Sequence, residues 1–468
     1  MKVLFCASEV FPFAKTGGLA DVCGTLPLAL ENQGVDVSII LPRYQSISIE
    51  KFRLKKINKE LYAVKIGRNI KVLFLENKKL FGRDGIYGYN GGDYPDNLER
   101  FQYYSRRTVD LLKELDFQFD IIHCHDWHAA LIPVYLKTIY KSDAFYKRIK
   151  TVLTIHNLAY QGFFPKTDFS KLGLPMKFFG PDALEFFGRI NLLKGGIIFS
   201  DRVTTVSPQY AKEIQAKQLG FGLDGVLKDK EGSLRGILNG LDYRIWDSAK
   251  DTFLAKKYSK ETFERKYENK KYIQKTLKLK IQNDIPLFGF IGRMTEQKGM
   301  QLILDALDDF LKMDIQLIFL GTGEERYQAA LKRTASRHPK KVAVVLKLSE
   351  AWAHRIYAGS DFFLMPSTFE PCGLSQLISL KYGAVPIAYK TGGLVDTIQN
   401  FDGQNGNGFV FSEYTKEVFV RTVKKAAELY RTKNVFNKLV KKTFDCDFSW
   451  DKSAAEYHKL YDECLRLA

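Results

Sequence analysis

Short apolar runs alternate along the chain with longer segments whose apolar residues recur at helical spacing. In the first part of the chain, runs typical of buried strands cover residues 3–7, 35–41, 70–75, 121–124 and 151–155, and helix-like segments cover 19–30, 96–115 and 128–140. Gly34 and Pro42 stand where a helix and a strand should end. Strands that alternate with helices predict a parallel, doubly wound sheet.

The same alternation starts again in the second half of the chain. Strand-like runs cover residues 287–291, 315–320, 342–346, 361–365 and 385–388, and helix-like segments cover 300–311, 351–358 and 374–382. We therefore predict two α/β domains, at residues 1–242 and 243–449. The amphipathic segment 450–468 is expected to form a helix that packs back on the N-terminal domain. In such sheets, ligands bind beyond the carboxyl ends of the strands.

Composition narrows the class of protein. Of 468 residues, 45% are hydrophobic and 26% are charged, which is ordinary for a globular protein. The apolar start reaches Glu9 too soon for a signal peptide, and Lys194 interrupts the stretch 190–199, so we expect no membrane partner. Six scattered cysteines without a C-x-x-C pair fit reduced thiols, and we expect a cytoplasmic location.

The net charge of +18 points either to nucleic acid or to an anionic small substrate. The lysines are densest at residues 256–280 and 424–442, and both stretches are helix-like. We expect solvated helix faces there, because neither stretch has the arginine-rich or aromatic-interleaved pattern of a nucleic-acid groove. Nucleic acid is therefore not an expected partner, and a basic nucleic-acid-binding protein remains only an alternative.

One pentapeptide, Lys-Thr-Gly-Gly-Leu, occurs at residues 15–19 and again at 390–394, each time between an apolar run and a helix-like stretch. Glycines such as Gly17 and Gly18 let backbone N–H groups approach an anion, and the helix N-terminus and Lys15 add positive charge. Asp21 either favours the helix dipole or accepts a hydrogen bond from a sugar hydroxyl. The repeat predicts phosphate chemistry in two α/β halves.

A second polar cluster follows the strand-like run at residues 121–124. Residues 123–128 read His-Cys-His-Asp-Trp-His, with Asp126 and Trp127 at the strand end. The spacing matches no common zinc motif, so we expect no metal. Polar groups beside a tryptophan suit a carbohydrate, which has hydroxyls on its edge and C–H groups on its faces. His156 and Asn157 follow the next strand, where a purely structural histidine is the alternative.

The second half carries two further clusters at strand ends. Arg293 and Lys298 lie in a loop that leads into a helix, where two cations can bracket a diphosphate and neutralise a leaving group. Glu370 lies between a strand and a helix and can hold sugar hydroxyls. Cys372 lacks an obvious paired base, so a structural role is favoured over a nucleophilic one. No G-x-G-x-x-G follows the first strand and no Walker motif occurs, which argues against a dinucleotide-dependent dehydrogenase.

Seven segments, taken together and in order, resemble the bacterial glycogen synthase and plant starch synthase family. They are K-T-G-G-L-A-D-V, H-D-W-H, T-I-H-N-L-A-Y-Q-G, I-L-N-G-L-D, G-R-x-x-x-Q-K-G, P-S-x-F-E-P-C-G-L and T-G-G-L. The resemblance covers nearly the whole chain. It implies a GT-B fold, with two Rossmann-like domains facing across a deep cleft. It also implies transfer of glucose from ADP-glucose to the non-reducing end of glycogen or another α-1,4-glucan, with retention and without a cofactor or metal.

The resemblance also implies roles for individual residues. The catalytic set is Glu370 and His156 beside the donor sugar and Arg293 and Lys298 on the diphosphate. The substrate-binding set is Lys15, Gly17, Gly18, Asp21, Asp126, Asn157, Asn239, Cys372, Gly373, Leu374 and Ser375. The second Lys-Thr-Gly-Gly-Leu receives no catalytic cation and is expected to shape the wall near Glu370.

One position departs from the family pattern. Leu348 occupies the place where many bacterial members have a tyrosine beside the adenine ring. Strictness for ADP-glucose over UDP-glucose is therefore open, and another retaining GT-B glucosyltransferase that uses UDP-glucose is the alternative. A noncatalytic glucan-binding protein is a second alternative. Oligomeric state is not predicted.

Overall fold

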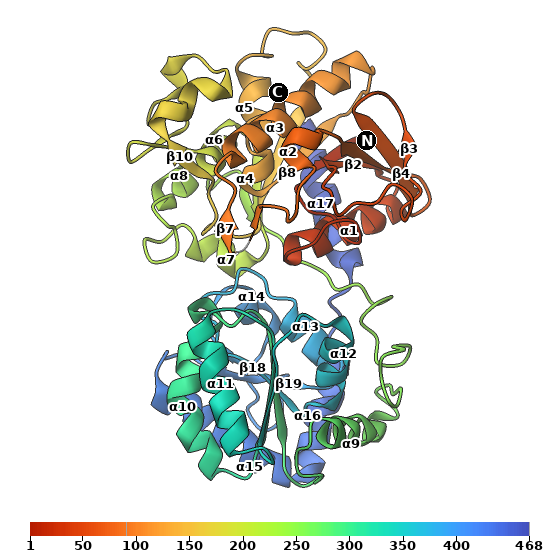
Figure 1. Cartoon of the computed structure of the whole chain (residues 1–468), viewed down its shortest axis with the longest axis vertical. Coiled ribbons are helices and arrows are strands. Elements are labelled where there is room, and N and C mark those ends of the chain that lie inside the picture. The colour runs from red at the N-terminus through yellow and green to blue at the C-terminus, as the bar shows by residue number, and fades with distance from the viewer. Residues whose placement is uncertain (90, 468) are drawn as a thin grey trace. The chain divides into compact units, whose positions relative to one another are not determined.

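The computed structural model describes residues 1–89 and 91–467 (Figure 1). The chain divides into two compact units. The first unit contains residues 1–240 and the C-terminal segment that begins at Trp450, and the second unit contains Leu241–Ser449. Each unit has its own largely parallel sheet flanked by helices, so the predicted α/β class is confirmed.

The sheet of the first unit has nine strands in the order β14-β13-β9-β8-β1-β2-β5-β4-β3. All neighbouring strands from β14 to β5 pair in parallel, and β4 and β3 add an antiparallel edge. The strands are β1 (Lys2–Cys6), β2 (Asp36–Pro42), β3 (Lys55–Lys56), β4 (Leu61–Ile66), β5 (Ile70–Leu75), β8 (Ile121–His125), β9 (Lys150–Ile155), β13 (Arg202–Thr205) and β14 (Leu234–Gly236). The largely apolar sequences of β1, β2, β5 and β9 follow from burial on both faces of the sheet.

Helices cover this sheet, and two small sheets lie beside it. The helices are α1 (Gly18–Asn32), α2 (Lys78–Phe81), α3 (Asn97–Glu114), α4 (Asp126–Ala129), α5 (Leu131–Lys137), α6 (Leu192–Phe199), α7 (Pro208–Glu213), α8 (Asp224–Asp229) and α17 (Trp450–Leu465). The small sheets contain β10 (Phe163–Pro165), β11 (Glu185–Phe186) and β12 (Arg189–Asn191), and β6 (Gly88–Tyr89) with β7 (Gly92–Asp93). Helix α17 buries Tyr457 and Tyr461 within the first unit, and the Tyr461 hydroxyl lies 2.8 Å from His123 Nδ1 of β8.

The helix predicted at residues 128–140 is instead two short helices, α4 and α5. Pro133 explains the break, because it has no N–H to bond the carbonyl of Ala129 in a continuous helix. Proline is tolerated in a first helical turn, and Pro133 lies in the first turn of α5. No helix of the described residues is long and apolar enough to span a membrane.

The second unit has a six-stranded parallel sheet in the order β17-β16-β15-β18-β19-β20. Its strands are β15 (Leu287–Ile291), β16 (Gln316–Leu320), β17 (Val342–Val345), β18 (Phe362–Met365), β19 (Val385–Tyr389) and β20 (Phe409–Phe411). Its helices are α9 (Lys266–Thr276), α10 (Met300–Lys312), α11 (Glu325–Arg337), α12 (Glu350–Gly359), α13 (Ser375–Lys381), α14 (Gly392–Thr397), α15 (Lys416–Arg431) and α16 (Lys433–Phe444). Buried aromatic side chains such as Phe288 and Phe362, whose ring centroids are 4.9 Å apart, fill its core.

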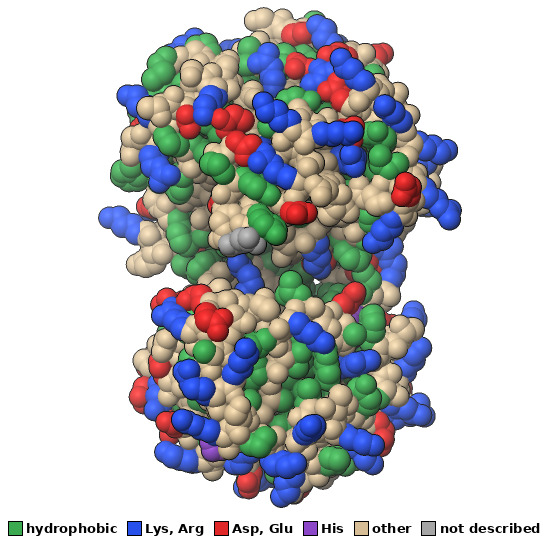
Figure 2. Space-filling view, viewed as in Figure 1, with side chains coloured by type: hydrophobic (Ala, Val, Ile, Leu, Met, Phe, Trp, Pro, Cys, Tyr) green, Lys and Arg blue, Asp and Glu red, His purple; other side chains and the backbone are tan. Residues whose placement is uncertain are grey.

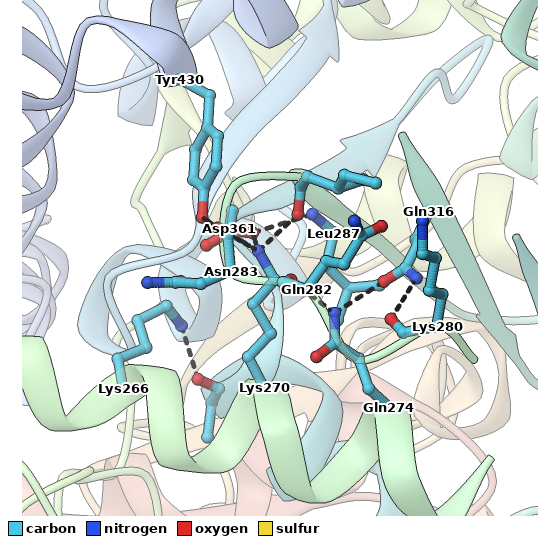
Figure 3. Close-up of polar contacts among 12 residues, drawn as sticks. Lys266, Lys270, Gln274, Lys280, Gln282, Asn283, Leu287, Gln316, Asp361 and Tyr430 are labelled. Atoms are coloured by element: carbon cyan, nitrogen blue, oxygen red, sulfur yellow. Dashed lines mark hydrogen bonds and ion pairs between the residues drawn. The ribbon is translucent and has the colours of Figure 1, made fainter. Parts of the chain in front are cut away.

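The lysine-rich stretches are solvated as predicted, with two exceptions. Lysine and arginine side chains are dispersed among acidic and neutral ones over the visible surface of both units (Figure 2). Lys266 and Lys270 on α9, however, are buried, so the prediction of a solvated face is wrong for them. Their ammonium groups point into the second unit, where they have specific partners (Figure 3).

Lys270 joins α9 to the sheet. Its Nζ lies 2.6 Å from Asp361 Oδ2 and donates to the Tyr430 hydroxyl at 2.9 Å. The same Asp361 oxygen accepts the N–H of Leu287, the first residue of β15, at 2.8 Å. The pair therefore ties α9 to the start of β15 and to the residue before β18.

Lys266 holds the carboxyl ends of two helices. Its Nζ donates to the carbonyls of Tyr357 and Ala358 in α12 and of Tyr382 just after α13, at 2.7 to 3.0 Å. Burial lowers the pKa of this lysine to about 7, and nearby Asp361 opposes the shift. A cation is favourable at a helix C-terminus, where the carbonyls lack intrahelical partners.

We predict that Lys270→Met destabilises the second unit by about 3 kcal/mol, because it leaves the buried Asp361 carboxylate without its cation. Hydrogen exchange of the full chain should show faster exchange over β15 and β18. Lys271→Met, at the exposed neighbouring position of α9, is the matched control and should leave exchange unchanged. Equal protection of β15 and β18 from exchange in both variants would contradict a stabilising role for the Lys270–Asp361 ion pair.

Candidate active site

The loop that carries the first Lys-Thr-Gly-Gly-Leu is anchored by Glu9, which is 3% exposed. The Glu9 carboxylate accepts two hydrogen bonds from Thr16. One comes from the Thr16 backbone N–H and the other, at 2.7 Å, from its hydroxyl. It also accepts the N–H of Gly17 at 3.1 Å and the hydroxyl of Tyr87 at 2.6 Å. Glu9 therefore holds the loop from inside the protein. This role of Glu9 is not among the predictions made from the sequence, although an acidic residue just after a buried strand was the available signal.

Lys15 and Asp21 form an ion pair at the start of α1. Lys15 Nζ lies 2.6 Å from Asp21 Oδ1, and the Lys15 side chain is 45% exposed. Because the N–H of Gly17 already donates to Glu9, the N–H groups that α1 leaves without intrahelical partners begin at Gly18. The two predicted polar residues thus lie together, with a helix N-terminus beside them.

Asp126 and His156 follow the neighbouring parallel strands β8 and β9. Asp126 Oδ1 accepts the backbone N–H of His156 at 2.7 Å. Burial raises the pKa of the Asp126 carboxyl to about 7, against the effect of backbone hydrogen bonds from His156 and Asn157. The carboxylate thus fixes the turn that carries two predicted site residues.

The histidines of β8 have structural partners. His123 Nε2 lies 2.6 Å from the Thr154 hydroxyl, and His125 Nδ1 lies 3.0 Å from His156 Nε2. Burial lowers the pKa of His156 to about 3, so its imidazole is neutral near pH 7. Among residues 1–89 and 91–467, no group of three or more His, Cys, Asp or Glu side chains is placed to hold a metal ion.

Two predicted amides lie at the same edge of this sheet. The Asn157 side chain accepts the N–H of Ala159 at 3.0 Å, which stabilises the turn after β9. Asn239 follows β14 and is 6% exposed, and its Oδ1 has no hydrogen-bond partner among the residues that the structure describes. A buried acceptor of this kind is costly unless a ligand or solvent satisfies it.

In the second unit, Lys298 and Glu370 form an ion pair. Lys298 follows β15 and Glu370 follows β18, and these strands are parallel neighbours. Lys298 Nζ lies 2.6 Å from Glu370 Oε2, which also accepts the Ser367 hydroxyl at 3.0 Å. The Glu370 side chain is 8% exposed and that of Lys298 is 23% exposed. The structure therefore brings together two of the predicted catalytic residues.

The second Lys-Thr-Gly-Gly-Leu packs against the segment that carries Glu370. A Cβ on Gly392 would lie 2.0 Å from the Glu370 carbonyl oxygen, and φ of Gly392 is +44°. The N–H of Gly393 donates to the same carbonyl at 3.0 Å. The second copy therefore packs directly against the backbone of Glu370, and its expected role in shaping a wall of the site stays a prediction.

The remaining predicted residues of the second unit lie in the loops after β15, β17 and β18. Arg293 is exposed two residues after the end of β15, and Leu348 is 85% exposed just before α12. Cys372 is buried, which agrees with the structural role favoured for it. Gly373, Leu374 and Ser375 lead into α13. Their contacts with a ligand remain predictions.

Comparison with known protein families gives two matches. The family model described as starch synthase catalytic domain matches residues 2–229. The model described as glycosyl transferases group 1 matches residues 273–443.

Individual proteins match over the whole chain. The chain is 45% identical over 481 residues to a glycogen synthase of Desulforamulus reducens and 42% identical over 486 residues to one of Thermotoga maritima, with 99% of both chains covered in each case. The catalytic domain of starch synthase IV from Arabidopsis thaliana, bound to ADP and acarbose, matches with a TM-score of 0.91 and 33% identity over 99% of both chains. Sucrose-phosphate synthase from Thermosynechococcus elongatus, at 14% identity and a TM-score of 0.62, shares the fold.

Alanine substitution of a glycine should reduce the stability of the protein by different amounts in the two Lys-Thr-Gly-Gly-Leu copies. Gly392→Ala should destabilise the protein by about 2 kcal/mol, because it combines a left-handed backbone with a clash at the Glu370 carbonyl. Gly17→Ala should cost less than about 1 kcal/mol, because Gly17 is extended and a Cβ there meets nothing within 4 Å. Urea unfolding of the full chain measures both, and equal losses would refute the difference in packing.

Proposed function

Because the chain belongs to the glycogen synthase and starch synthase family, we propose that it transfers glucose from ADP-glucose to the non-reducing end of an α-1,4-glucan, with retention at the anomeric carbon. The observation that carries this proposal is the full-length similarity to glycogen synthases, at 45% identity over 99% of both chains. The related starch synthase IV is bound to ADP and acarbose, which fits an adenine nucleotide and a saccharide as ligands. The fold is GT-B.

The proposed reaction exchanges one bond at the donor sugar. The bond between C1 of glucose and the phosphate oxygen of ADP breaks. The 4-hydroxyl oxygen of the terminal acceptor glucose bonds to C1 on the same face, and its proton passes to a phosphate oxygen of the departing ADP. A separate pair of carboxylates, as used by hydrolases, is then not required.

Cations supply the main stabilisation in this scheme. Lys298 and Arg293 bind the diphosphate as negative charge builds on the leaving ADP, and Lys15 and the N–H of Gly18 contact its phosphates. Gly373, Leu374 and Ser375 receive phosphate and ribose at the start of α13. The ion pair between Lys298 and Glu370, at 2.6 Å, supports a proposal in which neighbouring phosphate and sugar groups are bound by the lysine and the carboxylate respectively.

In the proposal, neutral and acidic polar side chains orient the sugars. His156 is uncharged at neutral pH, so it acts on sugar hydroxyls as a hydrogen-bonding group. Asp21, Asp126, Asn157 and Asn239 support it with carboxylate and amide oxygens. The unpartnered Oδ1 of Asn239 is suited to accept a hydrogen bond from a hydroxyl.

The decisive experiment is incubation of the protein with labelled ADP-glucose and glycogen. Incorporation of label into the polymer is the expected result, and no incorporation by a folded protein that binds nucleotide would refute the proposal. UDP-glucose in parallel tests the alternative donor. A preference for UDP-glucose would show that the chain uses a different donor from the one proposed. The comparison is motivated by the exposed Leu348.

The repeated motif offers a matched pair of variants. Lys15→Ala should lower kcat/KM at least tenfold, because it removes a cation from the donor phosphates. Lys390→Ala removes the equivalent lysine from the second copy and should change kcat/KM less than twofold. Equal effects would contradict the unequal roles of the two copies.

The pH dependence of kcat/KM should report Asp126. Its ionised carboxylate accepts the N–H groups that fix His156 and Asn157, so activity should rise as pH increases through about 7. His156 stays neutral throughout this range and adds no inflection. Asp126→Asn should be less active and nearly independent of pH between 5.5 and 8, to within about twofold. An unchanged acidic limb in this variant would show that another group is responsible.

A further inference from the structure

We propose that His125 is a positioning residue for glucose transfer, because its imidazole holds that of His156 in a single orientation and a single tautomer. The proposal rests on the glucan synthase function above, in which His156 acts on sugar hydroxyls. It adds a buried residue that contacts no substrate and works only through its hydrogen bond to His156.

The two rings meet where β8 and β9 end. His125 is the last residue of β8 and pairs with Thr154, and His156 directly follows β9. His125 Nδ1 lies 3.0 Å from His156 Nε2, and the ring centroids are 5.3 Å apart. His125 is fully buried, whereas His156 is partly exposed. A group inside the protein therefore holds one nitrogen of a ring that is partly open to solvent.

The His125 ring is itself fixed by its surroundings. It packs against the rings of Phe5 and His123, whose centroids are 5.0 and 4.2 Å away. His123 in turn has both ring nitrogens bonded, with Nδ1 2.8 Å from the Tyr461 hydroxyl and Nε2 2.6 Å from the Thr154 hydroxyl. Close packing leaves a fully buried ring little freedom to rotate. The bond that His125 makes to its neighbour therefore has a fixed direction.

The hydrogen bond couples the protonation of the two rings. Burial lowers the pKa of both His125 and His156, so each imidazole is neutral near pH 7. A neutral imidazole has one N–H donor and one acceptor nitrogen. In the shared bond one ring donates and the other accepts, so the ring proton of His156 is confined to one of its two nitrogens. His125 thus determines whether His156 meets a sugar hydroxyl as an acceptor or as a donor.

Folding stability does not explain a histidine at position 125. Nε2 of His125 is buried and has no hydrogen-bond partner among the residues that the structure describes. A buried polar atom without a partner costs stability, and an apolar side chain would avoid that cost. The neighbouring His123 differs, because both of its nitrogens are bonded. What an imidazole at position 125 provides is the bond to His156.

An orientation that is fixed before the substrate binds favours transfer. With Nε2 engaged by His125, His156 can offer only Nδ1 to a sugar. A ring free to flip would present either nitrogen in either protonation state, and only part of this population would suit the sugar. Loss of the constraint should therefore lower the rate of transfer and leave the binding of the nucleotide unchanged.

The first test compares activity and stability in variants at position 125. His125→Leu removes the hydrogen bond and the unpartnered nitrogen together, so kcat should fall about tenfold while the urea midpoint stays unchanged or rises. The KM for ADP-glucose should stay within about twofold. His125→Asn places an amide near the position of Nδ1, where it can donate or accept, and should restore kcat to within about threefold.

A double-mutant cycle shows whether His125 acts through His156. His156→Ala should itself lower kcat, and the addition of His125→Leu should change kcat no further, to within about twofold. Losses that multiply in the double variant would overturn the proposal, since His125 would then act independently. Tyr461→Phe is the matched control, because it removes a hydrogen bond from His123 and none from His125. It should lower the urea midpoint and leave kcat within about twofold.

Nitrogen-15 NMR of the full chain, labelled in histidine, measures the tautomer directly. In the unaltered protein, His156 should show one protonated and one unprotonated ring nitrogen, with its signals assigned by their loss in His156→Ala. In His125→Leu, both signals should move toward the averaged position of exchanging tautomers. Unchanged His156 signals in His125→Leu would overturn the proposal, and so would averaged signals in the unaltered protein.

The outcomes also distinguish this proposal from the function on which it rests. If the unaltered protein transfers no glucose to any glucan, the proposed function fails, and the NMR comparison still tests the bond between the two rings. If the protein transfers glucose and His125→Leu keeps full kcat, only the role of His125 fails.

Discussion

Parallel strand pairing is the constraint on which the cluster of candidate site residues in each unit depends. It brings the carboxyl ends of neighbouring strands to one edge of a sheet, so residues far apart in sequence become neighbours. In the first unit, β8 and β9 place Asp126 2.7 Å from the N–H of His156. In the second, β15 and β18 place Lys298 2.6 Å from Glu370, although 72 positions separate them.

Buried polar and charged side chains also fix the backbone beside the strands. Glu9 accepts hydrogen bonds from the loop before α1, and Lys270 joins α9 to Asp361 beside β18. Lys266 binds carbonyls at the ends of α12 and α13. Because a buried charge without partners is costly, each of these groups restricts the backbone around it. Glu9 thus holds the loop that carries Lys15 from inside, whereas Lys270 and Asp361 fix the opposite edge of the second sheet, where β15 and β18 begin.

The sequence alone predicted the α/β class, most of the strands and the positions of the polar clusters, because apolar periodicity and strand-end chemistry are local signals. It did not predict the burial of Lys266 and Lys270, since a helix rich in lysine looks the same whether or not its carbonyl partners lie nearby. Because their sequences are identical, the two Lys-Thr-Gly-Gly-Leu copies also gave no sign that their backbone conformations and contacts differ. Gly17 is extended beside Glu9, whereas Gly392 is left-handed against the Glu370 carbonyl.

The stereochemistry of the product tests the account most directly. A short maltooligosaccharide is incubated with ADP-glucose labelled with carbon-13 at C1, and the product is examined by nuclear magnetic resonance. We expect a labelled anomeric carbon in an α-1,4 linkage at the non-reducing end, because the acceptor hydroxyl attacks from the face that ADP leaves. A β linkage, or label recovered only as free glucose, would contradict it.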